Sequence, residues 1–85
     1  MYELNDINPL ADFILECRFS NGILKKVDLK PFLNKEAFLP LQDAGNFKKA
    51  VNKNYFVEWL GLDIDLSADT LWHLGIWESH RFDNF

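Results

Sequence analysis

The chain has 85 residues and a formal net charge of −4, a size that fits one domain with a small core because such a chain buries only about 60% of its unfolded surface. The negative charge argues against direct binding to nucleic acid, which depends on Lys and Arg side chains that neutralise phosphates. No apolar run approaches the roughly 20 residues that span a bilayer, and the first residues lack a signal-peptide pattern. We therefore expect a cytoplasmic protein that binds no membrane.

Residues 2–8 predict a first strand. Tyr2, Leu4 and Asn8 fall on one side of it and Ile7 on the other. The strand is expected to end at Pro9, because proline has no N–H to donate to a β-ladder.

Residues 12–29 predict a β-hairpin, the clearest structural signal in the chain. Asn21-Gly22 lies between two apolar runs, which is typical of a tight turn. A two-residue loop would place Leu15 opposite Asp28, whereas the three-residue loop 20–22 places Leu15 opposite Val27. We predict the three-residue loop, with Gly22 at positive φ and Glu16 opposite Lys26. The buried face would then hold Phe13, Leu15, Phe19, Val27 and Leu29, and Arg18 and Leu24 would point away.

The second half of the chain predicts short helices, a strand and a final helix. Residues 34–39 suit one or two helical turns that stop before Pro40, and residues 44–51 suit a second helix capped by Asp43. Residues 55–60 have the composition of a strand, and residues 62–66 are extended. Ser67 is a well-placed N-cap for a helix over 67–77, with Asp69 in its first turn.

Together these elements predict an α+β fold. Its antiparallel sheet of about 4–5 strands would be built on the central hairpin 12–29 and joined by short helices and the C-terminal helix 67–77. No repeat or linker divides the chain, so residues 1–78 are expected to form one domain, followed by a tail over 79–85.

No residue pattern in the chain indicates catalysis, a metal or a cofactor. Cys17 alternates with buried positions and is expected to act as a small hydrophobe. His73 and His80 are seven residues apart, too far to share a metal on one helix. The run 63–69 places oxygen side chains at alternating positions, as a calcium loop does. Ala68 and Leu74 replace the glycine and the glutamate that such a loop requires.

The end of the chain carries more apolar side chains than the small core needs. Trp77, Phe82 and Phe85 come after the fold is expected to be complete. A leftover apolar cluster usually marks an interface, so these three residues are predicted to form a surface for a protein partner or a second copy. The alternative is that the tail folds back and covers a groove of its own domain.

Four segments in series carry a resemblance to a known family. They are residues 19–22, 27–33, 38–43 and 63–71, with the sequences FSNG, VDLKPFL, FLPLQD and DIDLSADTL. In that order and spacing they resemble DUF2442, a small bacterial domain family of unknown function, over about residues 3–72. The sequence departs at Trp59-Leu60-Gly61, where the family commonly has a Trp-Pro-Asn-Gly-like turn.

The resemblance implies a small α+β fold and no catalytic residue that could be assigned here. Some members of the family carry a helix-turn-helix domain after this one, which is not expected within these 85 residues. Others are encoded beside another small protein in arrangements resembling toxin–antitoxin pairs. We therefore expect a non-catalytic protein-interaction module, an antitoxin-like partner of a neighbouring gene's product. The alternative is a small-ligand-binding or catalytic domain with a cleft between sheet and helices.

Overall fold

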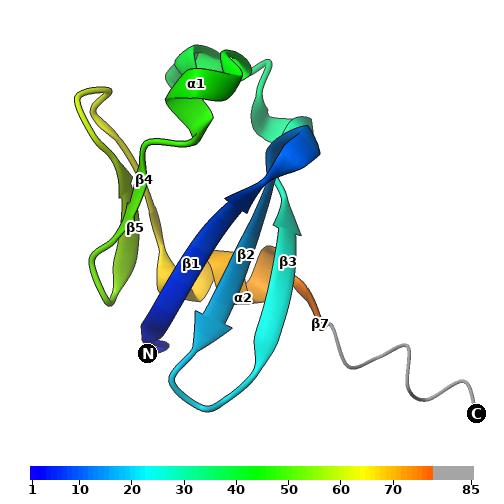
Figure 1. Ribbon diagram of the computed structural model, residues 1–85, viewed down its shortest axis with the longest axis vertical. Coiled ribbons are helices and arrows are strands. Elements are labelled where there is room, and N and C mark those ends of the chain that lie inside the picture. Colours follow the sequence, from blue (N-terminus) through cyan, green and yellow to red (C-terminus); the bar gives the residue numbers. More distant parts are fainter. Residues whose placement is uncertain (78–85) are drawn as a thin grey trace, which may run out of the picture.

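The computed structural model describes residues 1–77 of the chain (Figure 1). Its strands are β1 (Leu4–Leu10), β2 (Ile14–Phe19), β3 (Leu24–Asp28), β4 (Ala50–Asn52), β5 (Phe56–Trp59), β6 (Ile64–Ser67) and β7 (Ile76–Trp77). Its α-helices are α1 (Ala44–Phe47) and α2 (Ala68–Leu74), and its 3₁₀ segments are η1 (Ala11–Phe13), η2 (Lys30–Phe32) and η3 (Glu36–Gln42). The α+β class is therefore confirmed.

The central hairpin has the predicted register. Gly22 has φ +89°, and the Phe19 N–H donates to the Ile23 carbonyl at 2.9 Å, which closes a three-residue loop. Leu15 pairs with Val27, and Glu16 pairs with Lys26. The side chains of Leu15, Phe19, Val27 and Leu29 are buried, as predicted, and Arg18 is exposed.

Phe13 departs from the predicted hairpin. It lies in η1 at φ +59°, outside the strand, and is only half-buried. Its carbonyl still accepts a hydrogen bond from the Leu29 N–H at 3.0 Å, so the predicted pairing is kept while the side chain turns partly outward.

The first strand runs through Pro9, where it was expected to end. β1 lies at the edge of its sheet, and a proline there need not donate to a neighbouring strand. A bulge between Leu4 and Asp6 also shifts the alternation of side chains. Leu4 and Ile7 consequently both belong to the core, while Asn8 is exposed, contrary to the prediction.

The strands form two sheets, which corrects the prediction of a single sheet. The first sheet has the order β1-β2-β3-β7 and the second β4-β5-β6, with every pairing antiparallel. The chain leaves the first sheet at Leu29 through the 3₁₀ segments, so β4 to β6 pair among themselves. The sheets meet where the Leu4 N–H donates to the Asn54 carbonyl and the Asn52 side chain donates to the Leu4 carbonyl.

The helical segments between the sheets have other bounds than predicted. η3 continues through Pro40 to Gln42, because a new 3₁₀ turn starts at the proline, whose carbonyl accepts from the Asp43 N–H. Asp43 caps α1 as predicted, by accepting from the Gly45 and Asn46 N–H groups. The helix ends at Phe47, because Ala50 already belongs to β4, and the predicted extent 44–51 is wrong.

The last helix begins as predicted and ends early. The Ser67 hydroxyl accepts from the Thr70 N–H at 3.1 Å, which is the expected N-cap. The helix ends at Leu74 instead of Trp77, and Ile76–Trp77 pair with β3 as β7. Gly75 makes this turn possible: a Cβ there would lie 2.8 Å from the Lys25 Cβ.

Side chains from both sheets and both α-helices form one core. Trp59 of β5 is fully buried, and its indole N–H donates to the Phe47 carbonyl of α1 at 2.9 Å. The Trp72 ring of α2 stacks on Tyr2, with 4.2 Å between centroids, and meets Phe19 edge-on. Figure 1 shows α1 at one end of the two sheets and α2 toward the other. Within residues 1–77, no helix has the length and apolar character needed to cross a membrane.

Candidate functional sites

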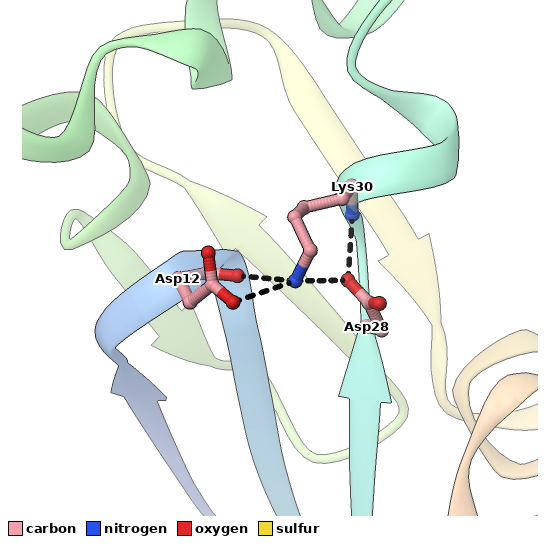
Figure 2. Close-up of polar contacts among 3 residues, drawn as sticks. All are labelled: Asp12, Asp28 and Lys30. Atoms are coloured by element: carbon pink, nitrogen blue, oxygen red, sulfur yellow. Dashed lines mark hydrogen bonds and ion pairs between the residues drawn. The ribbon is translucent and has the colours of Figure 1, made fainter.

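A lysine between two carboxylates fixes the backbone at the start of the hairpin. Asp12 and Phe13 both have positive φ, at 64° and 59°, a conformation that costs free energy in residues other than glycine. The Lys30 ammonium donates to the Asp12 carbonyl at 2.9 Å and contacts the Asp12 and Asp28 carboxylates at 3.1 and 3.0 Å (Figure 2). These contacts hold the turn in place.

The charges of this cluster reinforce each other. The backbone N–H of Lys30 donates to the Asp28 carboxylate, and together with the Lys30 ammonium it lowers the pKa of Asp28. The same carboxylate raises the pKa of Lys30. All three side chains are well exposed to water. The cluster therefore positions the turn more than it stabilises the fold.

A groove of about 250 Å³ lies beside this turn, between η1 and α1. It is lined by Leu10, Ala11, Asp12, Phe13, Ala44, Phe47 and Lys48. Phe13 and Phe47 meet edge to face, with ring centroids 5.5 Å apart. The groove is thus mostly apolar, with one acidic and one basic side chain among its lining residues.

The β3–β7 edge of the first sheet is a second candidate site. β7 pairs only with Lys25 and Lys26 of β3, and it ends the sheet order among residues 1–77. Ile76 is 68% exposed, and Leu74 just before it is also exposed. Among residues 1–77, these features leave the outer side of β7 without a strand partner and with exposed apolar side chains.

A buried lysine ties this edge to the last helix. Lys25 is only 6% exposed, and its ammonium donates to the Trp72 carbonyl at 2.6 Å and lies 3.7 Å from the centroid of the Trp72 ring. Burial lowers the pKa of Lys25. The favourable contacts to a helix-end carbonyl and an aromatic face offset that desolvation.

The structure places one of the three residues predicted to form an interface. The backbone of Trp77 pairs with Lys25, at the β3–β7 edge. Phe82 and Phe85, with His80 and the tail 79–85, lie outside the described residues. The interface therefore stays a prediction, of which the structure places only the backbone of Trp77.

Sequence reasoning missed Lys25 and Lys30. The predicted register already puts Lys25 opposite Cys17, on the buried face, so this signal was present in the pattern. For Lys30 no comparable signal exists, because Asp12 lies 18 residues away and meets Lys30 only through the strand pairing.

The remaining candidate residues that the structure describes make local contacts with structural roles. The Asp69 carboxylate accepts from the Tyr2 N–H, and Ser67 caps α2. His73 is exposed beside the Tyr2 ring. Across residues 1–77, no three His, Cys, Asp or Glu side chains come together in a way that could hold a metal ion.

Cys17 is predicted to be unreactive in the folded protein. It is fully buried, and burial, aided by the nearby Glu16 charge, raises the pKa of its thiol to about 12. Because the thiolate is the reactive form, Ellman's reagent near pH 8 should label native protein about 1,000-fold more slowly than a free cysteine. The urea-unfolded chain provides the control and should react at the free rate. Stoichiometric labelling of native protein within seconds would contradict the buried placement.

Comparison with known proteins identifies a family and no individual relative. Residues 4–76 match the model of DUF2442, a protein family of unknown function. Neither curated proteins nor solved structures give a significant match. The match covers most of the chain, and the chain therefore belongs to the DUF2442 family, as its sequence pattern indicated.

Proposed function

We propose that this DUF2442 protein is a non-catalytic protein-interaction module that binds a partner polypeptide along its β3–β7 edge. The observation that carries the proposal is the two-residue strand β7, which ends the described sheet and whose own Ile76 side chain is exposed. An open edge offers N–H and C=O groups that a partner strand can pair with, and nearby apolar side chains add affinity.

The chemistry of the partner follows from charge. The net charge of −4 favours a basic partner, because complementary charge speeds encounter and disfavours wrong partners. We infer a small, basic cytoplasmic protein encoded by a neighbouring gene, in an antitoxin-like arrangement. The alternative partner is a second copy of this chain, which carries the same negative charge and which the charge argument does not favour. Trp77, with Phe82 and Phe85 beyond the described residues, would extend the same surface.

Two measurements test this proposal. Sedimentation of the purified chain measures self-association, and co-expression with the tagged product of each adjacent gene measures binding to another protein. We expect one of these complexes to form and Ile76→Asp to weaken it about 30-fold, the size of a typical hot-spot effect. Leu60→Asp is the matched control, since Leu60 is also exposed, at 49%, but follows β5 in the other sheet.

The fold of both variants is checked by circular dichroism, and neither substitution removes a buried side chain. A monomeric chain that binds no adjacent gene product would reject the proposal. Equal binding by wild type and Ile76→Asp would reject this edge as the surface, even where a complex forms.

The second candidate function is small-ligand binding, which the groove between η1 and α1 supports. Leu10 of β1 also lines this groove, which supports the alternative of a ligand cleft between sheet and helices. Its two charged lining residues, Asp12 and Lys48, do not form a recognised catalytic arrangement. We therefore favour binding over catalysis at this position.

A further inference from the structure

The size of the groove between η1 and α1 limits what it can hold. Its volume of about 250 Å³ lies below the roughly 300–1,000 Å³ of pockets for drug-sized ligands. One phenyl ring together with a short side chain fits in it, because a cavity of about 150 Å³ already holds a benzene molecule. The half-buried Phe13 ring, which meets the buried Phe47 ring edge to face, offers such a group an aromatic surface.

The groove is held in shape by the protein itself. The Lys30 ammonium binds the Asp12 carbonyl, and the Leu29 N–H binds the Phe13 carbonyl, so two positive-φ residues of the wall are fixed by hydrogen bonds. On the opposite wall, the Asp43 carboxylate caps α1. A site fixed in this way loses little conformational entropy when a ligand binds.

The charges around the groove indicate the polar end of the ligand. The Asp12 carboxylate is already bound to Lys30, and Asp43 accepts from two backbone N–H groups. Lys48, by contrast, lines the groove with an exposed side chain that has no ion pair within residues 1–77. The charged lining group left to meet a ligand is therefore a cation.

We propose that this groove binds a small monocarboxylic acid, with its phenyl or short alkyl group against Phe13 and its carboxylate at Lys48. This inference rests on the second candidate function and is independent of the proposed partner surface, because η1, which lines the groove, and β7 lie at different ends of the first sheet (Figure 1). Either proposal can fail without the other.

The test is a titration of ¹⁵N-labelled full-length protein with phenylacetate, followed by amide chemical shifts. We expect saturable shifts confined to residues 10–13 and 44–48. Phenylacetamide, which has the same ring and no charge, should bind about fivefold more weakly, the size expected of one exposed ion pair. Added salt should weaken phenylacetate and leave phenylacetamide unchanged.

Two variants and one control locate the site. Lys48→Gln should raise the Kd of phenylacetate about fivefold, and Lys49→Gln should leave it unchanged, since Lys49 is exposed but does not line the groove. Ala44→Phe should fill the groove and abolish binding. Ala44 is exposed, so this variant is expected to fold, which its own amide spectrum will show.

Several results would overturn the proposal. They are shifts that do not saturate, shifts scattered over the surface, equal affinity for acid and amide, or no effect of Lys48→Gln. If acetyl-glycyl-phenylalanine binds and phenylacetate does not, the proposal of a small acid is wrong, and the ligand is the C-terminus of a peptide.

Discussion

Replacing Trp59 with alanine is expected to remove a large share of the protein's free energy of unfolding. Trp59 is fully buried, and it joins the second sheet to α1 through ring packing on Phe47 and a hydrogen bond to the Phe47 carbonyl. Removal of a buried tryptophan costs about 3–5 kcal/mol. A chain of this length has a total stability of about 4–13 kcal/mol, so the loss is a large share of it.

Urea unfolding of a paired series would separate the two contributions of Trp59. Trp59→Phe keeps an aromatic ring and leaves the Phe47 carbonyl without its donor, which should cost about 1–3 kcal/mol. Leu60→Ala is the control from the neighbouring, exposed position and should change little. Equal stability of Trp59→Phe and wild type would show that the indole hydrogen bond contributes nothing.

Replacing Lys25 should release the β7 edge. Lys25→Met keeps an apolar stem but removes the donor to the Trp72 carbonyl and the contact with the Trp72 ring. The loss is offset in part, because a methionine carries no charge to bury, and we expect a net cost of about 1–3 kcal/mol. Lys25→Ala also removes the stem and should cost more, by the cavity that it leaves.

Hydrogen exchange of the Ile76 and Trp77 amides would report this release directly. In Lys25→Met these amides should exchange faster than those of β2. Lys53→Met is the matched control, because Lys53 is exposed on the loop before β5. If Lys25→Met is as stable as wild type and its β7 amides stay protected, the ammonium does not hold the edge.

Several local features could be predicted because neighbouring residues decide them. The Asn21-Gly22 turn needs positive φ, and the choice of loop length followed from which register puts apolar side chains together. Ser67 and Asp43 cap helices because their side chains reach N–H groups two or three residues ahead. All four segments that resemble DUF2442 lie within the matched residues 4–76.

The errors lie where distant segments compete. The helix predicted through Trp77 ends at Leu74, because pairing of Ile76–Trp77 with β3 replaces further helical turns. The predicted helix 44–51 stops at Phe47, because Ala50–Asn52 pair with β5. Helical periodicity alone does not reveal that a strand partner is available.

The sequence by itself determined the α+β class, the hairpin register, the two capping residues and membership of the DUF2442 family. The tertiary structure decided how the strands divide into two sheets, where Lys25 and Lys30 bind, and where the groove forms. The physical reason is the sequence separation of the residues that make each contact. Turns and caps depend on contacts within a few residues, whereas Lys25 meets Trp72 across 47 positions and Lys30 meets Asp12 across 18, contacts that exist only after the chain has folded.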